Sequence, residues 1–178
     1  MKTPQLSVQI THSKPPRIGG LWVILLFFIS AAKILAAEPA DNLAAKTFTL
    51  EMAQHLLGGP TEPAKRNSQA DIRNGSTVVS QCSYSVKGDD ITPRTISLLL
   101  RRAGDAAEAK NIFLSSKRTY NGQDITDLGD GAYRTAAPAQ LNVLKSSNWL
   151  IISAGAFPKA DTALQEKAAR EILKNIRD

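Results

Sequence analysis

Two neighbouring segments alternate between apolar and polar residues, and this alternation is the feature that most limits the fold. Residues 76–86 (STVVSQCSYSV) and 94–102 (RTISLLLRR) each gather apolar side chains on one face, and residues 87–90 (KGDD) between them are typical of a turn. The apolar positions are Val78, Cys82, Tyr84 and Val86 in the first segment and Ile96, Leu98 and Leu100 in the second. The pattern predicts an antiparallel hairpin with one buried face.

Three segments predict helices, because their apolar residues recur at helical spacing and a capping residue precedes each. They are 48–57, which Gly58-Gly59-Pro60 ends, then Asp105 to about Tyr120, and 162–177. The first has Thr47 or Thr49 as its candidate cap, the second has Asp105 with Glu108 three residues later, and the third has Asp161.

Further strands are expected within residues 123–135, at 141–145 and at 149–154. The segment Trp149-Leu150-Ile151-Ile152 is apolar on both faces, which favours a central, covered strand. The sequence therefore predicts an α+β domain with an antiparallel sheet of about five strands and three helices. The expected order is α-β-β-α-β-β-β-α, with the helices packed mainly on one face of the sheet.

The first 37 residues have the composition of a leader. They contain Lys2, Lys14, Arg17 and Lys33 but no acidic residue, and residues 18–32 form an uncharged, mostly apolar run. A basic start, a short apolar run and small residues at its end are typical of a secretory signal peptide. Candidate cleavage positions follow Ala32, Ala36 or Ala37. The alternative is an uncleaved membrane anchor, although a spanning helix needs about 20 apolar residues.

This leader predicts export, with the periplasm as the first choice and secretion or an inner-membrane anchor as alternatives. Residues 38–46 (EPADNLAAK) are expected to form a linker, and residues 47–178 a single α+β domain. About 140 residues are enough for one self-sufficient core. Only the leader could bring the protein to a membrane.

Composition limits the chemistry of residues 38–178. These residues carry 18 basic and 16 acidic side chains, so their balance does not indicate nucleic-acid binding. Cys82 is the one cysteine of the chain, so no internal disulfide can form, and His55 is the one histidine after the leader. A Cys82–His55 nucleophilic pair is conceivable, but Cys82 alternates with apolar residues and is better interpreted as a buried hydrophobe.

Acidic residues gather in one short segment, at Asp124, Asp127 and Asp130. They could supply oxygen ligands to a hard cation, but the spacing lacks the alternate ligands and distal glutamate of a calcium loop. Turn formation is the simpler interpretation, because aspartate bonds its own backbone in bends. The sequence predicts no metal site, no cofactor and no catalytic residue. A hydrolase that uses Asp124 or Asp127 with Glu62 is kept as an alternative.

One set of basic residues is a candidate surface for an anion or a protein partner. It consists of Arg94, Arg101 and Arg102 on the second predicted strand, and Lys117 and Arg118 at the end of the second predicted helix. A solvated face is the competing interpretation of these charges.

Two segments resemble a known family of folds. The first is Leu56-Leu57-Gly58-Gly59-Pro60 followed by Cys82-Ser83-Tyr84, and the second is Ile125-Thr126-Asp127-Leu128-Gly129-Asp130-Gly131-Ala132-Tyr133. Together with the order of elements, they are similar to small exported bacterial domains of the PsbP/Mog1-like type, which include lipoprotein-like domains of unknown function. The resemblance implies a non-enzymatic accessory or binding role. We therefore expect an exported, non-catalytic binding domain with a protein or another envelope component as its partner.

Overall fold

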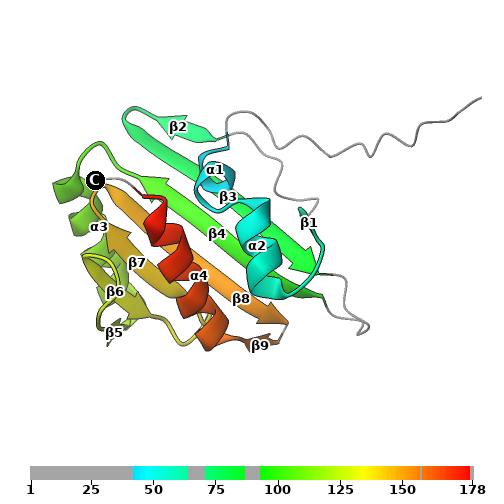
Figure 1. The fold of residues 1–178 in the computed structure, drawn as a ribbon. Helices are drawn as coiled ribbons and strands as arrows, with labels where there is room; N and C mark the ends of the chain where they lie inside the picture. The colour runs from blue at the N-terminus through cyan, green and yellow to red at the C-terminus, as the bar shows by residue number, and fades with distance from the viewer. Residues whose placement is uncertain (1–41, 64–70, 87–92, 157, 177–178) are drawn as a thin grey trace, which may run out of the picture. The chain divides into compact units, whose positions relative to one another are not determined.

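The computed structural model describes residues 42–63, 71–86, 93–156 and 158–176. Within these residues the chain forms an antiparallel sheet of nine strands with four helices (Figure 1). The helices are α1 (Leu43–Thr47), α2 (Leu50–Leu57), α3 (Ala106–Thr119) and α4 (Thr162–Lys174). The strands are β1 (Thr61–Pro63), β2 (Ile72–Asn74), β3 (Thr77–Val86), β4 (Arg94–Arg102), β5 (Gln123–Ile125), β6 (Gly131–Arg134), β7 (Leu141–Lys145), β8 (Asn148–Ala156) and β9 (Lys159–Ala160).

The main path of the sheet runs β1-β3-β4-β8-β7-β6-β5, and β2 and β9 add short pairs to β3 and β8. The predicted hairpin is confirmed as β3 and β4, in which Cys82 lies opposite Leu98. Strand β8 lies between β4 and β7 and is therefore central, as its apolar sequence predicts. Every strand pair within the described residues is antiparallel.

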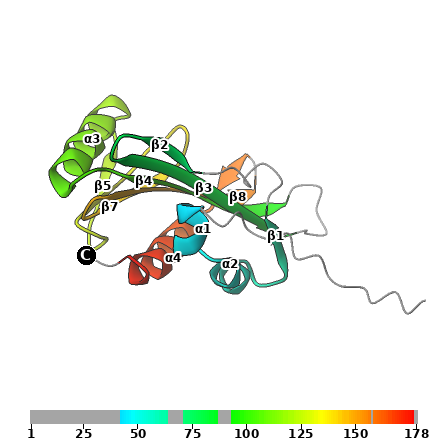
Figure 2. The ribbon, with the colours of Figure 1, turned by 90° about the horizontal axis from the view of Figure 1, so that it is seen from above.

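Helices cover the two faces of the sheet unequally (Figure 2). Helices α1, α2 and α4 lie on one face, over a large cluster that includes Leu98, Leu150 and Ile152. Helix α3 lies on the other face and buries a smaller cluster around Phe113, Tyr133 and Trp149. The prediction that helices pack mainly on one face is thus correct for three of the four described helices.

The α+β class and the antiparallel sheet are confirmed, but the predicted number and order of elements are wrong in detail. Residues 123–135 hold two strands, β5 and β6, and the strands that were not predicted, β1, β2 and β9, have only two or three residues each. Segments so short show no measurable alternation, and their partners on β3 and β8 decide their conformation. Helix α4 ends at Lys174, with Asn175 as its C-terminal cap, rather than at residue 177.

The predicted linker is also corrected, because residues 42–46 belong to the folded domain. Asn42 is almost fully buried and caps α1, whose Ala44 and Ala45 pack into the main cluster. A five-residue helix is too short for an apolar stripe to be recognised in the sequence.

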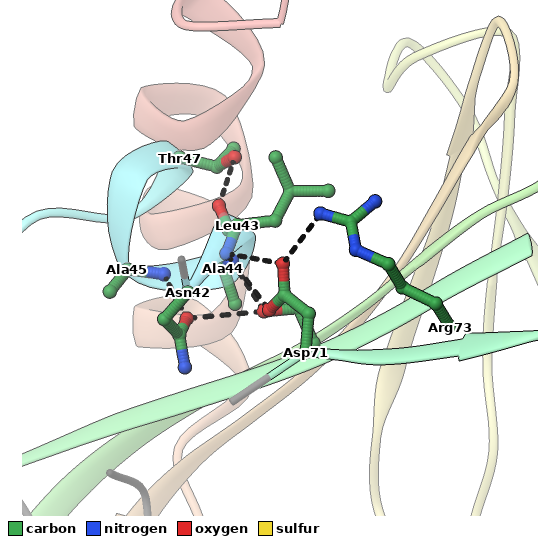
Figure 3. Close-up of polar contacts among 8 residues, drawn as sticks. Asn42, Leu43, Ala44, Ala45, Thr47, Asp71 and Arg73 are labelled. Atoms are coloured by element: carbon green, nitrogen blue, oxygen red, sulfur yellow. Dashed lines mark hydrogen bonds and ion pairs between the residues drawn. The ribbon is translucent and has the colours of Figure 1, made fainter. Parts of the chain in front are cut away.

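A cluster of polar contacts fastens α1 to the sheet (Figure 3). The side-chain oxygen of Asn42 accepts from the backbone N–H of Ala45 at 2.7 Å and from the hydroxyl of Ser80 at 3.1 Å. The carboxylate of Asp71 accepts from the backbone N–H of Leu43 at 3.0 and 3.2 Å. We call Asn42, Asp71 and Ser80 the N-terminal clasp. These contacts satisfy helix donors that would otherwise lack partners.

The predicted capping residues act as expected. Thr49, Asp105 and Asp161 each accept a hydrogen bond from a backbone N–H in the first turn of the helix that follows. Gly58 ends α2 in the left-handed conformation, with φ of 77°.

Candidate binding groove

The five basic residues singled out in the sequence do not converge on one site. Arg94 and Arg102 begin and end β4, so about 26 Å of extended chain separates them. Arg101 points to the opposite face of the sheet from Arg102, and Arg102 donates from Nε to Oδ1 of Asn148 at 3.0 Å. Lys117 lies 12 residues beyond Asp105, the N-cap of α3 that follows β4. About 18 Å of helix therefore separates Lys117 from the end of β4.

Lys117 and Arg118 line a shallow depression of about 800 Å³ on the outer side of α3. The Nζ of Lys117 lies 2.6 and 2.7 Å from the two carboxylate oxygens of Asp124, which neutralise its charge. These contacts leave Arg118 as the main positive group of the depression. An anion surface built from all five basic residues is therefore not assembled in this fold.

Cys82 and His55 lie in different environments. The Cys82 side chain is buried in the main cluster on β3, whereas His55 is exposed in the last turn of α2. The interpretation of Cys82 as a buried hydrophobe is confirmed.

The clustered aspartates act in turns and in ion pairs. Asp130 accepts from the backbone N–H of Ser146 at 2.6 Å, and Asp127 adopts a positive φ of 59°. Asp124 lies on β5 and Glu62 on β1, at opposite ends of the seven-strand path, about 29 Å apart by strand spacing. The strands that carry the two acids thus lie at opposite edges of the sheet. Among the described residues, no group of three potential metal-binding side chains is present.

A small groove lies on the face of the sheet that carries α3. It has a volume of about 190 Å³ and is formed by the C-terminal half of α3, the loop 135–140 and strands β7 and β8. We call it the groove and define it by its lining residues, which are Ser116, Tyr120, Thr135, Pro138, Gln140, Asn142, Trp149 and Ile151. All eight are uncharged, and they combine apolar surface with hydroxyl and amide groups.

Hydrogen bonds among the lining residues fix the shape of the groove. The indole Nε1 of Trp149 donates to Oδ1 of Asn142 at 3.1 Å, and both side chains are buried. The hydroxyl of Tyr133 donates to Oγ of Ser116 at 2.8 Å, which ties α3 to β6. On the loop, the backbone N–H of Thr135 donates to the carbonyl of Gln140 at 3.0 Å. Since these bonds exist within the protein alone, the groove is preformed.

The loop is also held from the opposite side of the sheet. Gln165 on α4 is completely buried, and its Nε2 donates to the carbonyl of Ala139 at 2.9 Å. Beside it, Arg134 forms an ion pair with Glu166 at 2.7 Å. Helix α4 therefore positions a wall of the groove although it packs on the other face.

Burial changes the pKa of one titratable side chain next to the groove, that of Tyr133. Desolvation raises the pKa of Tyr133 above its ordinary value of 10.0, and the hydrogen bond with Ser116 opposes this shift in part. The buried phenol is thus neutral over the physiological range and acts as a donor to Ser116.

Beyond the groove, the same face of the sheet carries a row of hydroxyl groups. Ser97 and Ser153 lie opposite each other on β4 and β8 and are partly exposed, and Ser83 beside them on β3 is buried. In the next row, the partly exposed Ser85 bonds to Thr95 at 3.0 Å. Ser153 also accepts from Nε2 of Gln140 at 3.2 Å. We call the partly exposed Ser85, Thr95, Ser97 and Ser153 the hydroxyl row, and it is continuous with the groove through Gln140.

The groove was not predicted from the sequence. Its residues come from three stretches of the chain, 116–120, 135–142 and 149–151, which meet through the packing of α3 on the sheet and the register of β7 and β8, in which Asn142 lies opposite Ile151. The one indication in the sequence is Trp149, the single tryptophan after the leader, which was assigned to a covered strand.

Comparisons with family models, with curated proteins and with solved structures find no match to this chain. Within the described residues, no helix combines the length and apolarity that a membrane span requires.

Proposed function

We propose that residues 42–176 form an exported, non-catalytic binding domain of the bacterial cell envelope, and that the groove is its recognition site. The observation that supports this most is the preformed, uncharged concavity of about 190 Å³, lined by convergent polar and aromatic groups. Binding sites are usually concave, preformed and mostly apolar, with a few placed polar groups. The resemblance to PsbP/Mog1-like domains, proposed on short motifs, agrees with an accessory or binding role.

Export is the second part of the proposal. It rests on the acid-free leader of residues 1–37, with a periplasmic location as the first choice and secretion or an inner-membrane anchor as alternatives. The clasp contacts start at Asn42, five residues after Ala37, so cleavage at any of the three candidate positions leaves the clasp intact. The mass of the mature protein from cells tests this. An N-terminus at residue 33, 37 or 38 is expected, whereas an intact N-terminus would favour the anchor.

Trp149 gives a direct test of the groove, because residues 38–178 contain no other tryptophan. Fractions of an envelope extract are added to purified residues 38–178, and Trp149 fluorescence and the melting temperature are followed. We expect at least one fraction to change both quantities in a saturable way, because ligand bound only to the native state stabilises it.

Two variants make this test specific. Gln140→Arg places a long, charged side chain in the groove, whereas Ala163→Arg adds the same side chain at an exposed position of α4. The response should be lost in Gln140→Arg and kept in Ala163→Arg. Equal responses of the two variants would show that recognition occurs elsewhere.

The hydrolase alternative gains no support from the geometry. Its proposed partner acids, Asp124 or Asp127 with Glu62, lie toward opposite edges of the sheet. Two-carboxylate catalysis requires groups within about 10 Å of each other.

A further inference from the structure

We propose that the groove binds one uncharged sugar ring of an oligosaccharide, with the hydroxyl row as the surface on which the adjoining rings lie. This inference rests on the proposed function, since it names the ligand class of the same groove. It follows from the size of the groove, from the chemistry of its lining and from what lies beside it.

Size limits the occupant to a single small ring. Sites for drug-sized ligands have volumes of about 300–1,000 Å³, whereas the groove has about 190 Å³. A longer ligand must therefore extend outside the groove. The surface that continues from it is the hydroxyl row, which begins at Ser153 beside Gln140.

The lining favours a neutral ligand that is both polar and apolar. A charged group would lose its hydration in the groove without an opposite charge to compensate it. The Thr135 hydroxyl already donates to the carbonyl of Pro138 and accepts from the N–H of Gln140, so the Gln140 side-chain amide is the group that a ligand can reach. A purely apolar group would cover this amide without satisfying its remaining hydrogen-bonding positions. A pyranose ring carries hydroxyl groups around its edge and C–H groups on its faces, and thus satisfies both requirements.

Tyr120 provides the surface against which such a ring can stack. It is 56% exposed at the rim of the groove, although large hydrophobic side chains are mostly covered in this domain. The apolar surfaces of Trp149 and Ile151 form further parts of the lining. An aromatic ring with a polar end is suited to a ligand of mixed character.

A peptide partner is less compatible with this location. Extended peptides bind most readily by adding a strand to a free sheet edge. Strands β7 and β8, which form the base of the groove, are already paired on both sides, with β6, β8 and β4 as their neighbours. A peptide over the groove would find no free strand backbone to pair with.

Titration of residues 38–178 with defined trisaccharides tests the proposal, with Trp149 fluorescence as the reporter. The probes are maltotriose, cellotriose and the N-acetylglucosamine trimer as neutral ligands, and trigalacturonate and the glucosamine trimer as charged ones. A tripeptide of glycine and serine serves as the peptide probe. We expect saturable binding of at least one neutral trisaccharide at micromolar to millimolar concentrations. Its affinity should exceed that of both charged probes at least tenfold.

Variants locate the contact. Tyr120→Ala and Gln140→Ala should each weaken the binding of the neutral trisaccharide about tenfold, which is the effect of losing one good contact. Leu114→Ala removes an exposed apolar side chain of the same helix outside the groove and should leave the affinity unchanged. Circular dichroism of all three variants confirms that they fold.

Three outcomes would overturn the assignment. They are the absence of binding by all three neutral probes at millimolar concentration, tighter binding of a charged probe or of the peptide, and unchanged affinity in Tyr120→Ala. If an envelope fraction still changes Trp149 fluorescence in any of these cases, the groove remains a binding site and only the sugar assignment fails.

Discussion

At the scale of single residues, a few polar side chains hold α1 on the sheet. The side chain of Asp71 is only 4% exposed and accepts two contacts from the N–H of Leu43, at the positive end of α1. Asn42, the N-cap of α1, and Ser80 on β3 complete the clasp. No local pattern in the sequence predicts this arrangement, because Asp71 lies 28 residues from the helix that it serves.

Removal of the Asp71 carboxylate should destabilise the domain. Asp71→Ala leaves the N–H of Leu43 without its partner, and loss of a helix-capping interaction costs about 0.5–2 kcal/mol. Urea unfolding of residues 38–178 measures the difference. Glu171→Ala is the matched control, because it removes an exposed ion pair with Lys174 that is worth less than about 1 kcal/mol. Equal losses in the two variants would contradict the role of the clasp.

Tyr133 should make the domain sensitive to alkaline pH. Burial raises the pKa of Tyr133 in the folded state above the ordinary value of 10.0, which applies to the unfolded chain. At a pH between these two pKa values, Tyr133 has lost its proton in the unfolded chain but keeps it in the folded protein. Stability therefore falls as the pH rises through this window, and the contribution is fully present below it. Unfolding free energies of the wild type and Tyr133→Phe, measured from pH 8 to about 11, isolate the effect. The wild type should lose more stability than the variant, and parallel curves would exclude the effect.

At the scale of elements, the sequence predicted long segments well and short ones poorly. Strands β4 and β7 occupy the predicted residues 94–102 and 141–145. Strand β4 alternates between a buried and a less buried face, whereas β7 is buried on both faces over its first four residues. Helix α1 and the strands β1, β2 and β9 were missed. The three strands have only two or three residues, and α1 has a single turn without a recognisable apolar stripe, so contacts with distant parts of the chain determine their structure rather than their own periodicity.

The turn between β5 and β6 depends on a glycine. Gly129 has φ of 62°, and a Cβ at this position would lie 2.4 Å from the backbone oxygen of Leu144. Gly75, at the tip of the β2–β3 hairpin, has a similar φ of 58° but open space around it. Gly129→Ala should therefore lose more stability than Gly75→Ala, which bears only the conformational cost of about 1–2 kcal/mol.

Chemical unfolding of the two glycine variants measures this difference directly. A similar loss in both would mean that β7 moves away from the added methyl group without cost. Both glycines share the conformational strain of a positive φ, but of the two only Gly129 lies close to another part of the backbone. The difference between the two variants therefore measures the cost of that close approach.

At the scale of the whole molecule, the candidate site follows from the unequal cover of the two sheet faces. Three of the described helices cover one face, and α3 covers the other (Figure 2). The groove lies between the C-terminal half of α3, the loop 135–140 and the sheet. The sequence indicated the helices and strands, but it could not indicate which side of the sheet each helix occupies. The basic residues could be singled out in the sequence because they are charged. The residues of the groove are uncharged and come from separate stretches of the chain, so no feature of the sequence groups them.

The clasp and Phe48 together set the shortest chain that can fold. Phe48 is completely buried, its ring packs edge-on to Tyr84 at 5.3 Å, and its carbonyl accepts from the hydroxyl of Tyr84 at 2.9 Å. A protein that begins at residue 38 keeps all of these contacts, whereas one that begins at residue 49 loses them with α1. Because removal of a buried phenylalanine side chain alone costs about 3–5 kcal/mol, the shorter protein should be destabilised by at least this amount.

Urea unfolding of the two proteins, with a third that begins at residue 42 as control, tests this limit. The proteins that begin at residues 38 and 42 should unfold at similar urea concentrations, because the contacts of the clasp start at Asn42. The protein that begins at residue 49 should unfold at a much lower concentration or fail to fold. If it were as stable as the other two, α1 and Phe48 would be dispensable, and residues 38–46 would act as the linker that their composition suggests.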